Sequence, residues 1–206
     1  MKKASLFLKI NEVKYIDFVC LPLDAQHVLW KGRLPSELRL SDAQFEELWS
    51  KHPCESYITL YGRRILTPRW QQAYGKDYSF SGQTAEALPI PPLLSPILTW
   101  TQEVIESRLN GILVNWYDGA LNHYIGKHRD EGKGLIEQKP IVTISFGEHR
   151  VLRMRPWKGQ GYLDFEMKGG AVFIIPYVTN RSFTHEVPAS KRCRGRRISV
   201  TIRAFA

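Results

Sequence analysis

The sequence lacks the features that mark secreted, membrane-spanning and low-complexity proteins. Only three of its 206 residues are cysteine. Because Cys20, Cys54 and Cys193 are odd in number and scattered, they predict no disulfide framework and favour a reducing compartment. No apolar run reaches the roughly 18 residues that a membrane-spanning helix needs, and the first eight residues do not resemble a signal peptide. We therefore expect a globular protein of the cytoplasm, or of the nucleus if the source is eukaryotic.

Acidic residues are also in the minority. Asp and Glu number 20 against 29 Lys and Arg, which gives a formal net charge of +9. This balance favours a polyanionic partner, although many basic proteins bind no nucleic acid. With 43% hydrophobic and 12% aromatic residues, the chain is long and apolar enough to bury the core of a single domain.

Two helices are predicted in the N-terminal half. Ser41 and Gln44 have the spacing of a capping box, and the apolar residues that follow predict a helix to about residue 52. A second helix is expected over 95–110, with Ser95 as N-cap and Pro96 in its first turn.

From residue 112 onward the pattern is one of short strands separated by turn signals, with no helix between them. We predict strands at 112–117, 122–128, 141–146, 151–155, 162–166, 171–175, 183–187 and 197–205. Such a succession is typical of a β-sandwich or jelly roll.

His128 and Asp130 form a His-x-Asp pair near the middle of the chain. On an extended strand these two side chains point to the same face, where they could hold one metal ion. With a distant third ligand, for which His185 in the strand-like run 183–187 is the candidate, they would form a 2-His-1-carboxylate triad. By itself the pair is more typical of a solvated turn than of a metal site.

The last predicted strand alternates strictly between apolar and polar residues. Ile198, Val200 and Ile202 share one face, and the other face carries Arg197, Ser199, Thr201 and Arg203. At roughly 3.3 Å per residue, the Cα atoms of the two arginines lie about 20 Å apart. Leaning inward over two small residues, their guanidinium groups leave space for a short dicarboxylate. The alternative is the polar outer face of an edge strand.

Together with Asn115-x-Tyr117, these motifs resemble the AlkB family of Fe(II)/2-oxoglutarate dioxygenases over about residues 55–205. The resemblance implies an α+β, mostly β fold with a double-stranded β-helix (jelly-roll) core. It also implies Fe(II) held by His128, Asp130 and His185, with 2-oxoglutarate and O2 as cosubstrates. The anchors implied for 2-oxoglutarate are Asn115, Tyr117, Arg197, Thr201 and Arg203.

The same resemblance implies how the single domain is organised. Residues 1–54 would be an N-terminal elaboration with helices, and 55–91 a nucleotide-recognition lid. Residues 92–206 would be a helix plus the jelly-roll catalytic core. We expect a monomer.

The segment 59–82 is similar to the DNA-repair branch of the family, in which a hairpin probes the duplex. Tyr61 stands where the residue inserted into DNA would be, filling the gap left by a flipped base. Arg69 and Arg129 would hold phosphates, and Tyr78 and Phe80 would line the base pocket. The full set of implied substrate contacts is Tyr61, Arg63, Arg64, Arg69, Tyr78, Phe80, Arg129 and Glu131.

Two departures from the family pattern leave the base preference open. Gly132 stands where repair members carry an acidic residue, with Glu131 beside it, and the loop over 75–78 is short. The remaining histidines, His27, His52, His123 and His149, are assigned to packing or the surface.

The resemblance implies an oxidative demethylase that repairs DNA damage, removing N-linked methyl groups from N1-methyladenine and N3-methylcytosine. The products would be formaldehyde, succinate, CO2 and the repaired base. Alternatives are the same chemistry on RNA or a protein side chain, and a non-catalytic nucleic-acid-binding jelly roll, which would be expected to lack the metal ligands and both arginines.

Overall fold

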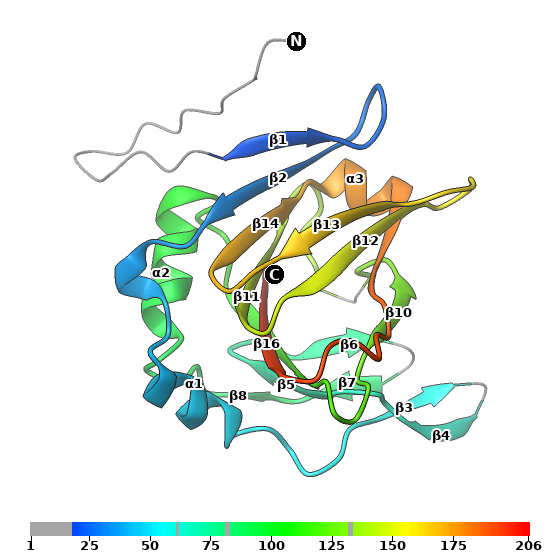
Figure 1. The fold of residues 1–206 in the computed structure, drawn as a ribbon. Coiled ribbons are helices and arrows are strands. Elements are labelled where there is room, and N and C mark those ends of the chain that lie inside the picture. Colours follow the sequence, from blue (N-terminus) through cyan, green and yellow to red (C-terminus); the bar gives the residue numbers. More distant parts are fainter. Residues whose placement is uncertain (1–17, 61, 81–82, 132–133) are drawn as a thin grey trace.

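The structure, a computed structural model, describes residues 18–60, 62–80, 83–131 and 134–206, and it is mostly β (Figure 1). The larger sheet contains, in spatial order, β1 (Val19–Pro22), β2 (Val28–Arg33), β14 (Ala171–Ile175), β11 (Ile141–Gly147), β16 (Arg196–Arg203), β9 (Gly111–Asp118), β5 (Trp70–Tyr74) and β8 (Ala87–Leu88). The smaller sheet contains β10 (Ile125–His128), β15 (Phe183–Val187), β12 (Arg150–Pro156) and β13 (Leu163–Met167). Two facing sheets confirm the predicted mostly-β jelly-roll class.

Two hairpins and a few short helices complete the described chain. The hairpins are β3 (Tyr57–Leu60) with β4 (Arg63–Leu66), and β6 (Tyr78–Phe80) with β7 (Gln83–Ala85). The helices are η1 (Ser36–Leu38), α1 (Asp42–Trp49), α2 (Ser95–Val104) and α3 (Tyr177–Ser182). Within the described residues, no helix combines the length and apolar character needed to cross a membrane.

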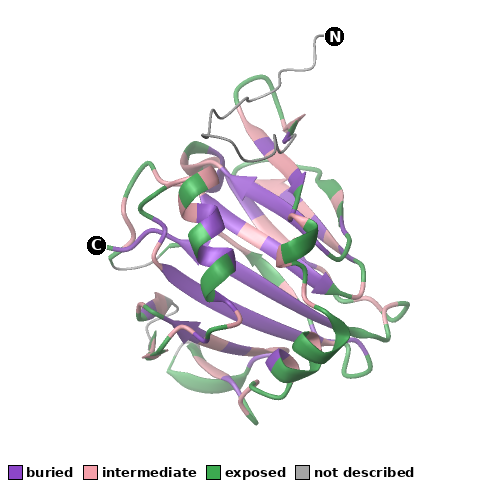
Figure 2. Cartoon of the chain, turned by 90° about the vertical axis from the view of Figure 1, so that its left-hand side faces the viewer, coloured by how far each residue is buried: buried purple, intermediate pink, exposed green. Residues whose placement is uncertain are grey.

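The hydrophobic core has two parts, one on each face of the larger sheet. On the helical side, Ile198, Val200 and Ile202 of β16 pack in one cluster with Ile97 and Trp100 of α2. Figure 2 shows α2 lying across the buried strands of this sheet. A second cluster fills part of the space between the two sheets. The apolar face of β16 is therefore buried against the helices, which turns its polar face toward the smaller sheet.

The helix predictions were correct in place but not in extent. The Ser41 hydroxyl accepts from the Gln44 N–H at 3.3 Å, and the Gln44 side chain accepts from the Ser41 N–H at 2.9 Å, so the capping box of α1 is confirmed. The second helix begins at Ser95 with Leu94 as its N-cap, and it ends at Val104 rather than at 110. The chain turns after Val104, so the helix does not reach Asn110. The Asn110 side chain donates to the Phe205 carbonyl oxygen and accepts from the Phe205 N–H.

The structure adds to the predicted strands and corrects one of them. Arg63 and Arg64 lie on strand β4, and the stretch 67–82 contains β5, which pairs with β9 inside the main sheet. The strand predicted from residue 122 begins at Ile125, since the chain turns before it. Helix α3 was not predicted at all.

The predicted division into elaboration, lid and core remains a prediction. Strand β2, from the first segment, and β5, from the second, belong to the same sheet as the core strands. The three segments therefore all contribute strands to one sheet, and the predicted boundaries separate strands of that sheet.

Candidate metal and cosubstrate site

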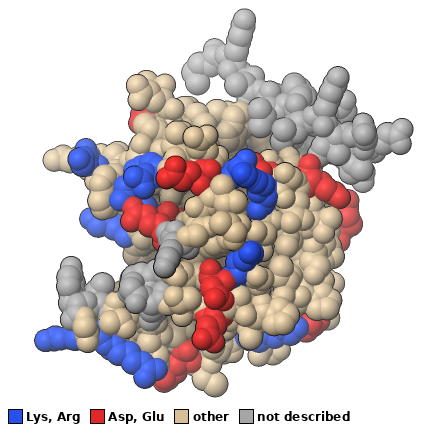
Figure 3. Space-filling model, turned by 180° about the vertical axis from the view of Figure 1, so that it is seen from behind, with Lys and Arg blue, Asp and Glu red and all other residues tan. Residues whose placement is uncertain are grey.

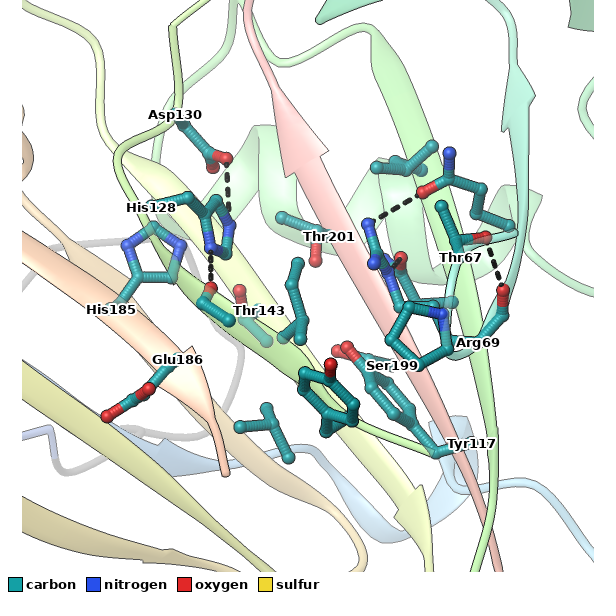
Figure 4. Close-up of a pocket in the computed structure, with 18 of the residues that line it drawn as sticks. Thr67, Arg69, Tyr117, His128, Asp130, Thr143, His185, Glu186, Ser199 and Thr201 are labelled. Carbon is teal, nitrogen blue, oxygen red and sulfur yellow. Dashed lines mark hydrogen bonds and ion pairs between the residues drawn. The ribbon is translucent and has the colours of Figure 1, made fainter. Parts of the chain in front are cut away.

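A cavity of about 740 Å³ lies between the two sheets. It is lined by the polar face of β16, by β9, and by the strands and loop that carry the three predicted metal ligands. Figure 4 shows His128, Asp130 and His185 close together, with Tyr117, Ser199 and Thr201 along the neighbouring strands of the larger sheet. The predicted metal ligands and 2-oxoglutarate anchors thus share one cavity.

The three predicted metal ligands come together, although not for the reason inferred from the sequence. His128 and His185 are cross-strand partners in the β10–β15 ladder. Strand β10 ends at His128, so Asp130 is not placed by strand alternation. One potential ligand atom from each of the three residues lies within 4.8 Å of the others, and His128 Nε2 is 3.7 Å from Asp130 Oδ1.

Asp130 is held by side chains from two other elements. Arg203 donates to its Oδ2 from Nε at 3.0 Å and from Nη2 at 2.7 Å, and the Tyr78 hydroxyl donates to Oδ1 at 3.3 Å. Burial alone would raise the pKa of the Asp130 carboxyl, but the charge and hydrogen bonds of Arg203 outweigh burial and hold the pKa well below its ordinary value. The carboxylate is therefore ionised, as metal ligation requires.

The two imidazoles are kept neutral. Burial, with a smaller contribution from His128, lowers the pKa of His185 to about 3, and burial also lowers the pKa of His128. His128 Nδ1 lies 2.8 Å from the Gly126 carbonyl oxygen, a contact that places the proton on Nδ1 and leaves Nε2 for a metal. His185 Nδ1 is buried without a hydrogen-bond partner among the described residues. The donor set and its protonation states fit Fe(II).

Arg197 is a buried cation, and no described residue forms an ion pair with it. Its side chain is 1% exposed, and its hydrogen bonds go from Nε to the Ser145 hydroxyl at 2.9 Å and from Nη2 to the Met167 sulfur at 3.3 Å. Nη1 is buried and has no partner in the described part of the chain. Burial lowers the pKa of Arg197 to about 10, so it remains charged at neutral pH. An unpaired buried charge is costly, and a ligand carboxylate would compensate it.

The other predicted 2-oxoglutarate anchors also line the cavity. Tyr117 lies beneath the Arg197 guanidinium, 5.0 Å from ring centroid to Cζ. Asn115 accepts a hydrogen bond at 2.9 Å from Arg69 Nε through its Oδ1, which turns its NH2 group toward other partners. Thr201 and Arg203 line the same wall. The roles of these residues toward 2-oxoglutarate remain predictions.

Arg69 points into the cavity and not out to solvent. Besides Asn115, it bonds Gln71 from Nη2 at 2.8 Å, and burial lowers its pKa. If Arg69 holds a phosphate of the substrate, it does so from the cavity wall.

The predicted substrate residues divide into paired and exposed groups. Arg129 is paired with Glu131, lies 4.0 Å over the Trp157 ring and donates to the Arg181 carbonyl at 3.1 Å. Arg63 and Arg64 are exposed on β4. In Figure 3, basic side chains project from the molecule where the β3–β4 hairpin lies when seen from behind. Tyr61, Gly132 and the side chain of Phe80 lie outside what the structure describes, so their predicted roles are neither supported nor contradicted.

The remaining histidines lie away from the three-residue cluster. His123 is buried against Trp70, with ring centroids 4.7 Å apart, and its Nδ1 accepts from the Asp118 N–H at 3.1 Å, so the predicted packing role holds. Three supporting residues were not predicted from the sequence: Ser145 and Met167, which bond Arg197, and Asn180, which bonds the backbone of Asp130. Nothing in their local pattern marks them.

Comparisons with known proteins agree with this geometry. The sequence profile described as "2OG-Fe(II) oxygenase superfamily" matches residues 33–203. DNA oxidative demethylase ALKBH2 of Mus musculus is 30% identical over 157 residues, covering 71% of this chain and 65% of the relative. The Homo sapiens protein of the same name is 29% identical over 157 residues, covering 71% of this chain and 60% of the relative. The matched region thus spans less than two thirds of these relatives' own length.

More distant similarity was found in sequence and in structure. Alpha-ketoglutarate-dependent dioxygenase alkB homolog 3 of Rattus norvegicus is 27% identical over 147 residues, 66% of this chain and 50% of the relative. A solved structure titled "The structure of OsALKBH1" aligns with a TM-score of 0.56 at 15% identity, covering 90% of this chain and all of that one. At that identity the structural match supports the fold alone.

Proposed function

Since the chain belongs to the 2OG-Fe(II) oxygenase superfamily, with the resemblance to its AlkB branch confirmed by the relatives above, we propose that it is an oxidative demethylase of alkylated DNA. Membership implies Fe(II) as the cofactor, with 2-oxoglutarate and O2 as cosubstrates. The substrates we propose are N1-methyladenine and N3-methylcytosine, and the products are formaldehyde, succinate, CO2 and the repaired base.

The observation that carries the proposal is the pairing state of Arg197 and Arg203, the two arginines on the cavity-facing side of β16. Arg203 is committed to the carboxylate of a metal ligand, whereas Arg197 is buried in the same cavity with a guanidinium nitrogen left unsatisfied. One carboxylate of a dicarboxylate would pair with the Arg197 guanidinium, and its other end would chelate the metal. A structural arginine would be expected to carry its own anion, and a non-catalytic binding module has no need for the metal ligands.

Each residue has a part that its contacts define. His128, Asp130 and His185 would hold Fe(II), which together with 2-oxoglutarate supplies the oxidation of the N-methyl group. Arg203 keeps the Asp130 carboxylate ionised and fixes its orientation. The neutral imidazoles of His128 and His185 need lose no proton before they bind metal. Arg197, with Tyr117 beneath it, would fix the distal end of 2-oxoglutarate.

The choice of DNA rests on relatives and on charge. The two ALKBH2 relatives are named DNA oxidative demethylases, and the net charge of +9 together with exposed Arg63 and Arg64 suits a polyanion. The charge argues against a protein substrate, and the names of the relatives favour DNA over RNA. A DNA substrate agrees with the expected location in the cytoplasm or the nucleus.

The test measures formaldehyde release with Fe(II) and 2-oxoglutarate on one methylated sequence, supplied as single-stranded DNA, duplex DNA, single-stranded RNA and duplex RNA. We expect turnover on DNA, none without 2-oxoglutarate, and none with the unmethylated sequence. Turnover on RNA alone would transfer the proposal to RNA. Failure on every nucleic acid, alongside 2-oxoglutarate consumption, would overturn the nucleic-acid substrate.

A further inference from the structure

The short helix α3 makes reciprocal contact with the segment that carries Asp130. The Asn180 side chain accepts from the Asp130 N–H through Oδ1 at 3.0 Å and donates from Nδ2 to the Asp130 carbonyl oxygen at 2.8 Å. Both residues are 5% exposed. Because one bond needs a donor and the other an acceptor, the pair fixes which way the amide points.

Asp130 needs such a contact because it lies beyond the end of strand β10. A residue within a strand has its direction set by the ladder, but here the ladder ends at His128. Arg203 and Tyr78 hold the carboxylate of Asp130. Neither of these contacts fixes the backbone from which that carboxylate projects.

Helix α3 is also joined directly to the strand that carries the third ligand. It ends at Ser182, and β15 begins at Phe183 and contains His185. Strand β15 in turn pairs His185 with His128. Asn180 therefore connects Asp130 to the α3–β15 segment, and β15 also positions the two histidines through its pairing with β10.

We propose that Asn180 is a positioning residue for the metal site, fixing the Asp130 backbone so that its carboxylate meets the two imidazoles. This inference rests on the metal site of the proposed function. It assigns to Asn180 no contact with metal, cosubstrate or nucleic acid. Loss of a hydrogen bond that orients a metal-ligating residue typically lowers metal affinity by roughly 10- to 100-fold.

The experiment compares Asn180→Asp and Asn180→Ala with a matched control from the same helix. Asn180→Asp keeps an acceptor for the Asp130 N–H but loses the donor to its carbonyl oxygen. Thr179 is fully buried and donates to the Val28 carbonyl at 2.8 Å, so Thr179→Val also removes one buried hydrogen bond from α3, without touching Asp130. Unfolding of the metal-free proteins is followed to record the structural cost of each change.

Metal binding is measured on the whole chain by anaerobic titration with Mn(II), and ligand geometry by the visible absorption of bound Co(II). We expect Mn(II) affinity to fall by about tenfold or more in both Asn180 variants, with an altered Co(II) spectrum. Thr179→Val should keep wild-type affinity and spectrum even where its unfolding temperature falls equally.

The outcomes separate this inference from the proposed function. A wild-type protein that binds neither metal would overturn both. A wild type that binds metal, with Asn180→Asp and Asn180→Ala binding it equally well, would overturn only the role of Asn180. If Asn180→Ala does not fold, Asn180→Asp alone decides between these results.

Discussion

The metal and cosubstrate end of the cavity and the β3–β4 hairpin differ in how they are held. At the metal end the Asp130 carboxylate is held by hydrogen bonds from Arg203 and Tyr78. The hairpin pairs with no other described strand, and β4 is exposed along its whole length, with Leu66 56% exposed. Oxidation chemistry requires tightly fixed geometry, whereas surfaces that meet a large ligand are drawn from less stable parts of a fold.

The largest expected effect comes from removing one of the three proposed metal ligands. His128→Ala, Asp130→Ala and His185→Ala should each abolish turnover while leaving a folded protein, because two ligands hold Fe(II) poorly. Formaldehyde release measures turnover, and circular dichroism with thermal unfolding measures the fold. A folded His185→Ala protein with near-normal Fe(II)-dependent turnover would show that the metal set is wrong.

The next effect concerns the cosubstrate. Arg197→Lys replaces a planar fork with a point charge, and contacts to charged groups contribute about 1.5–3 kcal/mol. We therefore expect the KM for 2-oxoglutarate to rise roughly 10- to 100-fold while nucleic-acid affinity stays unchanged. Arg196→Lys is the control, since Arg196 lies next along β16 but pairs with Glu46 at the surface. Weaker nucleic-acid binding with an unchanged KM would move Arg197 to the substrate side.

A change in the exposed hairpin should instead depend on the form of the substrate. If Tyr61 fills the space left by a flipped base, Tyr61→Ala should lower activity on a methylated duplex about tenfold, since stacking contributes 1–3 kcal/mol per base. Activity on the same methylated strand without its complement should change little. Equal losses on both forms would leave Tyr61 as a packing residue.

Phe80→Ala sharpens the same comparison. A residue of the base pocket meets the base whether it arrives from a duplex or a single strand. Both substrates should therefore lose activity alike, and initial rates on the two forms give the ratio. A loss confined to the duplex would assign Phe80 to the probing hairpin instead.

The last effect is on the pH dependence of stability in the metal-free protein. The pKa of His185 falls from its ordinary 6.5 to about 3 on folding, so between these values the unfolded chain binds the proton that the folded protein excludes. Stability is therefore fully present above about pH 6.5 and declines as the pH falls toward 3. Urea unfolding across this range measures the decline, and His185→Gln should flatten it. An unchanged slope in His185→Gln would show that His185 is not the group responsible.

The sequence predicted the site better than it predicted the contacts that support it. The alternation in 197–203 identified both faces of β16, because a period of two is a local property of a strand. Asn180, Ser145 and Met167 act through contacts made across the fold, which no local pattern records. Arg69 shows the same limit, because a loop arginine in a basic protein is expected at the surface, whereas here Asn115 and Gln71 draw it inward.

The position of β16 in the sheet also determines the order in which the protein can fold. It follows β9 and β11 in the chain, yet it lies between them in the larger sheet, pairing Arg203 with Gly111 and Ser145 with Ser199. During synthesis, the edges of β9 and β11 that pair with β16 therefore stay unpaired until residues 196–203 emerge. Pairings so distant in sequence are typical of slow folding, in milliseconds to seconds, and unpaired edges in the interim favour aggregation. The strand that carries Arg197 and Arg203 is therefore also the strand on which completion of the larger sheet depends.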